Sequence, residues 1–333
     1  MVHINFICKD RTPDFANWDK TRFPESEYDI CFNSEEDKPW DCVVVQQNLP
    51  KKFNFQCRAG NVIYLCTEPP MMQPCPRSFT DQFDKIVVSN PKIRHRNRLL
   101  YHGFVTWMMG LNFSTNKERY SFKELASLEP KKTKLISIIS SNQRMMPGHN
   151  RRMAVIERLQ KDYPGVIDVY GKGFHFVDCK ADALLPYRFH ICIENSTIPY
   201  YWTEKFADPI LAQCVPIYCG CTNINDFFGE DGYFKFNIDD YKSLKAIIDR
   251  IIDNPDMVYK ANKVSLEGLR KTLMEKENSI PFVINLAQSN LHNDFMNYNI
   301  SPLTESKGYK WQLWLLRSKR YVYKRFFKLL YKI

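Results

Sequence analysis

The sequence predicts an α/β protein of two domains, each organised around a parallel sheet. Short apolar runs with polar ends recur along the chain, which is typical of strands buried on both faces of a sheet. One such run, residues 189–193, is followed by a polar loop, a helical segment and a second apolar run at residues 215–218, in the order of a βαβ unit. With 333 residues and 44% hydrophobic content, the chain is long enough for two hydrophobic cores.

The first domain is predicted to comprise residues 1–130. Three apolar runs predict strands of its sheet: residues 41–46, 61–66 and 85–89. The chain opens directly with a strand-like run, residues 1–8, where a secretory signal would otherwise stand. We therefore expect a cytoplasmic, bacterial-like protein. A polar stretch around Pro130 predicts the linker to the second domain.

The second domain is predicted to comprise residues 131–305. Its expected strands are residues 135–139, 166–170, 189–193 and 215–218. Between the first two of them, Asn150 is a credible N-cap of a helix. This helix begins with Arg151 and Arg152, although helix N-termini favour acidic side chains, and a bound anion would explain the basic start. The alternative is that Arg152 is a surface residue paired with Glu157.

A strongly polar loop joins the strand at residues 189–193 to the helix that follows. Between residues 194 and 205 the chain carries two carboxylates, an amide, a phenol and a lysine, namely Glu194, Glu204, Asn195, Tyr201 and Lys205. In open α/β sheets, ligands bind outside the carboxyl end of a strand and at a helix N-terminus, where this loop lies. A lysine beside a helix N-terminus is unfavourable unless an anion lies between them, so the loop predicts a phosphate site. The alternative is a plain helix cap, in which Thr203 and Glu204 only satisfy first-turn N–H groups.

These residues resemble the donor-sugar motif of the family 10 α-1,3/4-fucosyltransferases. The matching segments are Glu194-Asn195-Ser196, Tyr201-x-Thr-Glu-Lys205 and Val215-Pro-Ile-Tyr-x-Gly220. The resemblance is firm over residues 135–248 and thin elsewhere. Two departures stand out, namely Gln213-Cys214 before the third segment and Pro209 within the helix. Because proline is tolerated in a first turn, we expect Asp208 to cap a helix that starts at Pro209.

The resemblance implies two Rossmann-like domains of the GT-B glycosyltransferase type, with residues 131–305 binding the donor GDP-fucose and the first domain binding the acceptor. It further implies that Arg152 and Lys205 hold the donor's pyrophosphate. Tyr201 and Asn195 would form hydrogen bonds nearby, and Glu204 would accept hydrogen bonds from the ribose hydroxyls. Glu194 would orient either the loop or the fucose.

Transfer of a sugar with inversion requires a base that removes the proton from the attacking hydroxyl. By the same resemblance, Glu68 is the candidate, because it follows a strand that contains Tyr64. Asp81 and Asp84 are weaker alternatives. Equally, Glu68 fits a solvated loop carboxylate without a catalytic role.

The expected function is therefore that of an inverting, metal-independent fucosyltransferase. It would move L-fucose, in α-1,3 or α-1,4 linkage, to a GlcNAc-containing surface glycan such as a lipopolysaccharide or capsule. No Asp-x-Asp pair occurs in the sequence, which fits neutralisation of the pyrophosphate by Arg and Lys without a metal or other cofactor. The alternatives are a relative that uses another nucleotide sugar and, from a different class, a non-catalytic glycan- or nucleotide-binding protein.

The eleven cysteines favour neither a disulfide framework nor a metal site. They are scattered, odd in number and without a CxxC pair, and the seven histidines form no ligand pair. Several of the cysteines lie in apolar runs, where a free cysteine behaves as a small hydrophobic residue. We expect them to be reduced and structural.

The net charge of +10 belongs almost entirely to the C-terminal tail, predicted at residues 306–333. From Lys307 onward the tail holds nine Lys or Arg and no acidic residue, which leaves +1 for residues 1–306. A body so nearly neutral does not favour nucleic-acid binding. The tail predicts a basic amphipathic helix, with Arg320, Lys324, Lys328 and Lys332 on one side and Val322, Phe326, Leu329 and Ile333 on another. This pattern indicates peripheral binding to an anionic membrane, at the inner face of the cell membrane, and the alternative is a helix docked on the body.

Overall fold

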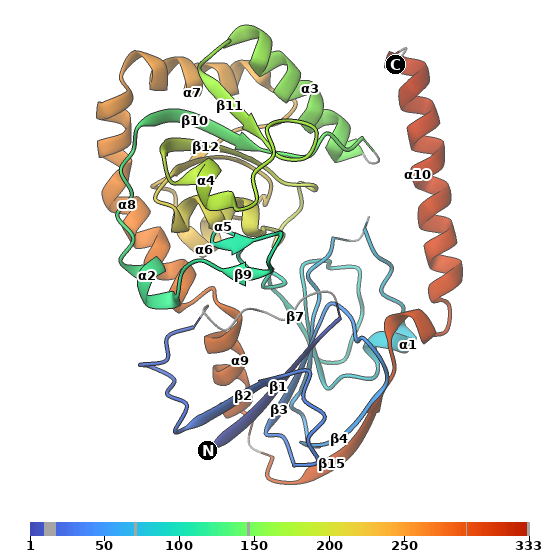
Figure 1. Ribbon diagram of the computed structural model, residues 1–333. Coiled ribbons are helices and arrows are strands. Elements are labelled where there is room, and N and C mark those ends of the chain that lie inside the picture. The colour runs from blue at the N-terminus through green and yellow to red at the C-terminus, as the bar shows by residue number, and fades with distance from the viewer. Residues whose placement is uncertain (10–17, 70–71, 145–146, 291, 332–333) are drawn as a thin grey trace. The chain divides into compact units, whose positions relative to one another are not determined.

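The computed structural model describes residues 1–9, 18–69, 72–144, 147–290 and 292–331, with side chains described up to Tyr323 except that of Pro147. The chain forms two compact units (Figure 1). The first unit consists of Met1–Val105, Pro199–Tyr201 and Glu277–Val322. The second unit consists of Thr106–Ile198, Trp202–Lys276 and Tyr323–Ile333.

The first unit is built on a six-stranded parallel sheet with the order β2-β1-β3-β5-β6-β7. Its strands are β1 (Val2–Cys8), β2 (Tyr28–Phe32), β3 (Cys42–Gln46), β5 (Val62–Leu65), β6 (Lys85–Val88) and β7 (Arg98–Leu100). The central strands β3 and β5 are apolar and completely buried, as expected for a parallel sheet that is covered on both faces. The strands predicted at residues 41–46, 61–66 and 85–89 are confirmed.

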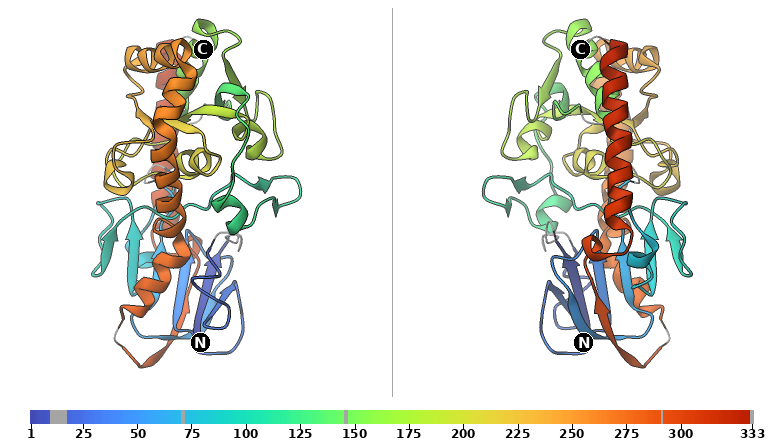
Figure 2. Two further views of the ribbon diagram at one scale, coloured as in Figure 1. Left: turned by 90° about the vertical axis from the view of Figure 1, so that its left-hand side faces the viewer. Right: turned by 90° about the vertical axis from the view of Figure 1, so that its right-hand side faces the viewer.

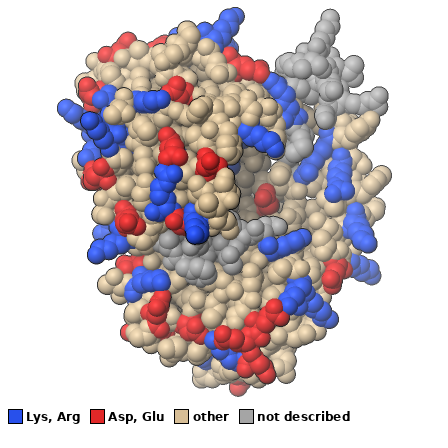
Figure 3. All heavy atoms as spheres, viewed as in Figure 1, with Lys and Arg blue, Asp and Glu red and all other residues tan. Residues whose placement is uncertain are grey.

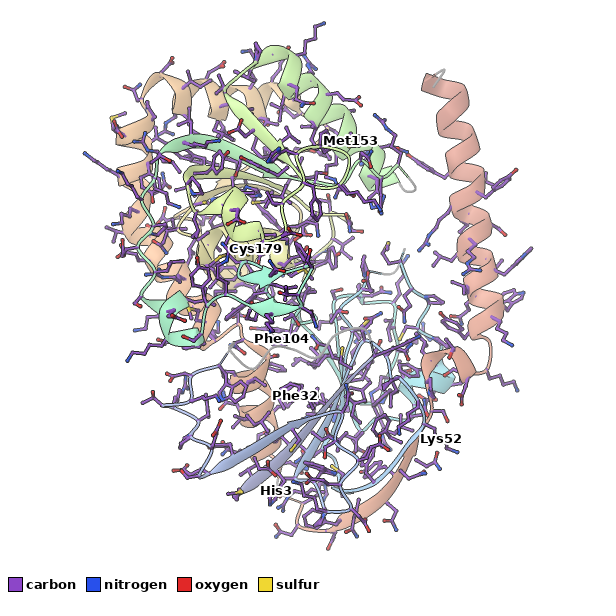
Figure 4. The ribbon with its side chains drawn as sticks, viewed as in Figure 1. His3, Phe32, Lys52, Phe104, Met153 and Cys179 are labelled. Carbon is purple, nitrogen blue, oxygen red and sulfur yellow. The ribbon has the colours of Figure 1, made fainter. Side chains whose placement is uncertain are left out.

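Two apolar clusters cover the two faces of this sheet. One contains Tyr64, Phe79 and Phe83, whose rings pack together, with α1 (Arg77–Thr80) contributing to it. The other contains Phe104 and, at its margin, Phe32, both labelled in Figure 4. This second face is covered by α9 (Ser279–Gln288), which buries residues at helical spacing: Ile280, Val283, Ile284 and Ala287.

The last part of the chain also belongs to the first unit. There β15 (Phe295–Ile300) pairs antiparallel with β4 (Phe53–Arg58), and η2 (Leu303–Glu305) follows it. The predicted boundaries at 130 and 305 therefore do not coincide with those of the structure. Apart from Pro199–Tyr201, the chain leaves the first unit after Val105 and returns at Glu277, because the apolar face of α9 covers the N-terminal sheet.

The second unit contains a five-stranded parallel sheet with the order β11-β10-β12-β13-β14. Its strands are β10 (Lys134–Ile139), β11 (Ile167–Tyr170), β12 (Tyr187–Ile193), β13 (Val215–Cys219) and β14 (Phe234–Lys235). A short hairpin of β8 (Leu111–Asn112) and β9 (Lys117–Glu118) stands apart from this sheet. The four strands predicted for this domain are confirmed, and so is the predicted class of two Rossmann-like α/β units.

The helices of the second unit lie between and after its strands. They are α2 (Phe122–Ala126), α3 (Pro147–Asp162), α4 (Lys180–Leu184), α5 (Glu204–Leu211), α6 (Asn225–Phe228), α7 (Tyr241–Asp253) and α8 (Pro255–Glu275). The N-terminal starts of two of them were predicted wrongly. Asn150 is not an N-cap, since α3 begins three residues earlier, at Pro147. Asp208 does not cap a helix at Pro209, because the Thr203 hydroxyl already caps α5 and Pro209 lies inside it.

The tail forms one continuous helix, α10 (Tyr309–Tyr331), which is seen in full in the right-hand view of Figure 2. Lys and Arg side chains follow one another along it at the right of Figure 3. Trp311 and Trp314 are 64% and 61% exposed, whereas Arg320 turns inward and donates a 2.7 Å hydrogen bond to the Met72 carbonyl. Arg320 is thus not part of a free basic face, and the tail side chains from Lys324 onward lie outside the described residues. No helix in the described part of the chain combines the length and apolarity needed to cross a bilayer.

Candidate active site

A cavity of about 290 Å³ opens in the second unit at the carboxyl ends of β10 and β12. Parallel α/β sheets bind ligands at this edge, where loops and helix N-termini converge. Among the predicted site residues, Arg152, Asn195, Glu204 and Lys205 line the cavity. The structure therefore brings together, from α3, from the loop after β12 and from α5, four side chains that the sequence placed at a donor site.

Two glycines allow the backbone to form this site. A Cβ atom on Gly148, in the first turn of α3, would lie 2.3 Å from the Asn195 carbonyl oxygen, so the helix can approach the loop only because residue 148 is glycine. A Cβ atom on Gly220 would lie 2.4 Å from the Glu194 side chain. Both residues therefore hold the loop after β12 close to its neighbours.

Glu194 is buried and does not line the cavity, but it ties the start of the loop to its end. Its carboxylate accepts a 2.8 Å hydrogen bond from the Thr203 amide and one of the same length from the Thr203 hydroxyl. Burial raises the pKa of Glu194, while the charge of Lys205 and the Thr203 hydrogen bonds act in the opposite direction. Its side chain is thus committed to the conformation of the loop.

Glu204 and Lys205, the first two residues of α5, face the cavity as an ion pair. The Lys205 ammonium lies 3.0 Å from Glu204 Oε1 and 3.7 Å from Glu194 Oε2. Burial by itself raises the pKa of Glu204, but Lys205 and Lys180 outweigh it and hold that pKa below its usual range. Burial lowers the pKa of Lys205, but the negative charges of Glu204 and Glu194 outweigh burial and raise that pKa. Lys205 is therefore protonated.

Arg152 is 6% exposed and donates a 2.9 Å hydrogen bond from Nη1 to Asn195 Oδ1. The alternative of a surface arginine paired with Glu157 is wrong, because Arg144 is the partner of Glu157. The positive charge of Arg152 lowers the pKa of Lys205, so the two cations act on one another at the cavity. Two cations that line one cavity favour binding of an anion there.

Two further residues of the cavity were missed from the sequence. Lys180, the first residue of α4, donates a 2.7 Å hydrogen bond to Asp208 Oδ2 and lies 3.6 Å from Glu204 Oε1. The signal for Asp208 was its spacing, since residues 204 and 208 are one helical turn apart and share a face of α5. Burial raises the pKa of Asp208, against the charge of Lys180.

Of the six predicted donor-site residues, Tyr201 alone belongs to the first unit. It is buried, but Pro199–Tyr201 belongs to the first unit, and Tyr201 is not among the residues that line the cavity. In the sequence, Tyr201 stands two residues before Thr203. That spacing does not indicate that Tyr201 belongs to the first unit and Trp202 to the second.

Glu68 lies in the first unit, in the loop after β5, and lines a second cavity of about 400 Å³. The side chain of Gln47 fixes this loop, because its carbonyl oxygen accepts hydrogen bonds from the Thr67 amide, the Thr67 hydroxyl and the Glu68 amide at 2.8 to 3.1 Å. Asp84, one of the two weaker candidates for the base, accepts hydrogen bonds from the Val62 amide and from the Tyr298 hydroxyl. Its carboxylate thereby joins β5 to β15. Asp81 pairs with Arg77 at the surface.

The described residues contain no group of three or more His, Cys, Asp or Glu side chains that could hold a metal ion. All eleven cysteines are free, and nine of them are buried. Burial raises the pKa of several of these thiols, among them Cys42, Cys192 and Cys214, which keeps them protonated.

Residues 129–261, which include the whole cavity edge formed by β10, β12 and α5, match the family described as glycosyltransferase family 10 (fucosyltransferase), C-terminal part. The resemblance to this family is thereby confirmed. The matched segment, residues 129–261, is called the family 10 domain here. The donor-site residues Arg152, Asn195, Glu204 and Lys205 all lie within it.

Other known proteins are similar to parts or to most of the chain. The α-(1,3)-fucosyltransferase B of Drosophila melanogaster is 31% identical over 87 residues, which is 25% of this chain and 19% of that protein, so the chain spans about a fifth of that relative's length. A crystal structure of an α1,3-fucosyltransferase with GDP-fucose is 16% identical, with a TM-score of 0.48, and 88% of this chain and 93% of that chain are covered. A crystal structure of an α1,3-fucosyltransferase with GDP is 15% identical, with a TM-score of 0.47 and the same coverage.

The family 10 domain thus presents cations, carboxylates and a helix N-terminus to one small cavity. Arg152 and Lys205 supply positive charge for phosphate oxygens, and the N-terminus of α5 adds its dipole. Glu204 supplies ionised oxygens that accept hydrogen bonds from hydroxyl groups. His190 stays neutral at the floor of the cavity, with its Nδ1 2.7 Å from the Ser137 hydroxyl, because burial and the charge of Lys180 lower its pKa to about 3. This set of groups suits a sugar nucleotide.

Proposed function

We propose that the chain is an inverting fucosyltransferase that moves L-fucose from GDP-fucose to a glycan hydroxyl. The observation that carries the proposal is the pair of cations, the buried Arg152 and the half-buried Lys205, at one cavity of the family 10 domain. A diphosphate between them would relieve their mutual repulsion. The similar proteins reported above are α1,3-fucosyltransferases, two of them solved with GDP-fucose or GDP, which agrees with this choice of donor.

In this proposal, Arg152 and Lys205 bind the pyrophosphate, and Glu204 accepts hydrogen bonds from the ribose hydroxyls. Asn195, which already accepts from Arg152, hydrogen-bonds at the same end of the donor. Tyr201, which does not line the cavity, is given no contact with the donor. Glu194 orients the loop rather than the fucose, since its oxygens are occupied by Thr203. Each predicted residue that lines the cavity thus contacts the donor, and Glu194 holds the loop that carries Asn195.

The reaction is a single displacement at the anomeric carbon of fucose. The acceptor hydroxyl oxygen forms the new C–O bond, the bond from that carbon to the β-phosphate oxygen breaks, and configuration is inverted. Negative charge develops on the departing GDP, where Arg152 and Lys205 stabilise it. Glu68 takes the proton of the attacking hydroxyl, as a general base positioned by Gln47.

The test is acceptor-stimulated release of GDP from GDP-fucose by the purified chain, with EDTA present throughout. Release that rises on addition of N-acetyllactosamine is expected, because the two cations replace a metal in neutralising the diphosphate. Glu68→Gln should then lower the turnover number by about a hundredfold or more while the Kd for GDP-fucose stays the same.

Two results would contradict this proposal in different ways. Turnover only with another sugar nucleotide would keep the transferase and replace fucose. Binding of glycan without any turnover, and unchanged by Glu204→Ala, would indicate a non-catalytic binding protein. A dependence on added divalent cations would contradict the metal-independent mechanism alone.

The acceptor that we propose is an N-acetylglucosamine unit of a surface glycan, such as a lipopolysaccharide or capsule, modified in α-1,3 or α-1,4 linkage at the cytoplasmic face of the membrane. The exposed Trp311 and Trp314, three residues apart on α10, support attachment of the tail to an anionic membrane. Lys310 and Arg317 are exposed on the same helix. Trp311→Ala/Trp314→Ala should reduce co-sedimentation with vesicles that contain anionic lipid, and equal sedimentation of both proteins would refute the attachment.

A further inference from the structure

The second cavity, in the first unit, has a marked excess of positive charge. Its charged lining residues are Glu68, Arg77, Lys92 and Arg94. Arg320 of α10 is close enough that the charge of Glu68 acts on its pKa. Three cations and one carboxylate therefore line about 400 Å³, whereas residues 1–306 as a whole are almost neutral.

The segment that carries two of these cations is held rigidly. Arg98 donates from Nη1 to the carbonyls of Pro91 and Ile93, at 2.7 and 2.8 Å. The Asn90 side chain accepts a 3.0 Å hydrogen bond from the Lys92 amide. Ile93 packs against the apolar cluster that covers this face of the sheet. The backbone around Ile93 is thus held in place, and the exposed side chains of Lys92 and Arg94 extend from it, one on each side of Ile93.

The charges of these two residues are not neutralised by the protein. Within the described ranges, neither Lys92 nor Arg94 forms an ion pair, although nearby Arg96 lies 3.8 Å from Asp84 and Arg77 lies 3.2 Å from Asp81. Cations that line a concave surface attract anions more strongly than cations on a flat surface, because the walls concentrate the field. The cations that line the second cavity therefore select negatively charged ligands.

We propose that Lys92 and Arg94 form a subsite for a negatively charged substituent of the glycan acceptor, a carboxylate or a phosphate. The proposal rests on the proposed function, in which Glu68 is the base. The hydroxyl of the acceptor must then lie near Glu68, which lines this cavity. The charged group of the acceptor binds at the Lys92 and Arg94 side of the cavity, while the reacting hydroxyl lies toward Glu68. The preferred substrate class is thus an acidic saccharide rather than a neutral one.

The test compares N-acetyllactosamine with its sialylated form, which carries a carboxylate, and with its phosphorylated form. The variant is Lys92→Ala/Arg94→Ala. The matched control is Lys20→Ala/Arg22→Ala, which removes the same residue types at the same spacing from the exposed turn that leads into the amino end of β2, at the other edge of the sheet. The quantity measured is the ratio of kcat/KM for each acidic acceptor to that for the neutral acceptor.

The wild-type protein should favour an acidic acceptor, and the double variant should lower that ratio by about fivefold to tenfold. The control variant should leave the ratio unchanged. Raising the ionic strength to about 0.5 M should weaken the wild-type preference, since salt screens exposed charges. The arm with the larger ratio, sialylated or phosphorylated, identifies the anionic group.

Equal ratios in the wild-type protein and the double variant, with good transfer to the neutral acceptor, would overturn the subsite and leave the fucosyltransferase intact. If no acceptor is fucosylated, the proposed function fails, and direct titration of the sialylated and phosphorylated oligosaccharides by calorimetry decides the subsite by itself. Weaker binding to the double variant than to the control would then support it. Loss of binding to anionic vesicles in the double variant, without loss of oligosaccharide binding, would assign these cations to a membrane surface and overturn the proposal.

Discussion

Arg151 and Arg152 are neighbours in sequence and differ in environment. Arg152 is buried at the cavity and bonded to Asn195, whereas the Arg151 side chain is 56% exposed and lies 3.5 Å from Asp239. Arg152→Gln should raise the Kd for GDP-fucose about thirtyfold, which corresponds to about 2 kcal/mol for a lost charge contact to phosphate. Calorimetric titration measures this change directly.

Arg151→Gln is the matched control for that experiment. It removes the same charge from the same helix turn but leaves the cavity intact, so the Kd should change by less than about threefold. Similar losses in both variants would mean that long-range charge, and not the contact made by Arg152, governs binding of the donor.

The buried His190 makes stability depend on pH. Its pKa is lowered to about 3 by burial and by the charge of Lys180, whereas the unfolded chain has the ordinary value of 6.5. Between these values the unfolded chain binds a proton that the folded protein does not, so the free energy of unfolding falls as the pH falls below about 6.5. His190 should contribute a loss of about 2 kcal/mol between pH 6.5 and 4.5.

Chemical denaturation at several pH values, for the wild-type protein and for His190→Gln, isolates this contribution. The variant should lose stability more slowly on acidification, and His292→Gln, at an exposed position, should follow the wild-type curve. Parallel curves for wild type and His190→Gln would show that His190 is not the group responsible.

The sequence predicted residue types at the donor site better than it predicted their contacts. Arg152 and Lys205 were found because cations at helix N-termini are unexpected, a local signal that needs no tertiary structure. The Lys180–Asp208 pair was missed because it joins α4 to α5 across 28 residues. Such a contact depends on how the helices lie over the sheet, which no periodicity encodes.

Helix α5 is held at its start by a single threonine. The Thr203 hydroxyl accepts from the Lys205 amide as N-cap and donates to Glu194, so it serves the helix and the loop together. Thr203→Val keeps the shape but leaves Glu194 without one of its donors. We expect the free energy of unfolding to fall by about 1 to 3 kcal/mol.

Thr203→Ser retains the hydroxyl and should recover most of that stability, which thermal denaturation of the two variants can compare. Equal destabilisation by both variants would mean that the threonine methyl group matters more than its hydrogen bonds. The start of α5 also explains an error of prediction. The helix was predicted to start at Pro209, five residues after its actual start at Glu204. The prediction avoided a proline inside a short helix, whereas in the structure the cap at Thr203 sets the start.

At the scale of the whole molecule, elements that lie late in the sequence can belong to the same unit as the N-terminal strands. Alternating strands and helices predicted the two sheets, because each strand carries its own apolar signal. They did not predict that α9 and β15, late in the chain, complete the first unit. An amphipathic helix shows that it covers a sheet but not which sheet it covers.

This return of the chain predicts how truncation will act. A chain ending at Lys276 lacks α9 and β15, so one face of the first sheet loses its apolar cover and β4 loses its partner strand. The first unit should unfold, whereas the second unit keeps Arg152, Glu204 and Lys205 and should still bind GDP-fucose. Limited proteolysis with mass spectrometry should show cleavage throughout residues 1–105 and protection of the family 10 domain.

A chain ending at Tyr323 is the control, because it removes the end of α10 and retains every described contact of the first unit, including that of Arg320 with Met72. It should resist proteolysis in both units. If the chain ending at Lys276 resisted equally, α9 would be dispensable to the first core. In that case the boundaries predicted from the sequence, at residues 130 and 305, would describe the folding units better than the contacts do.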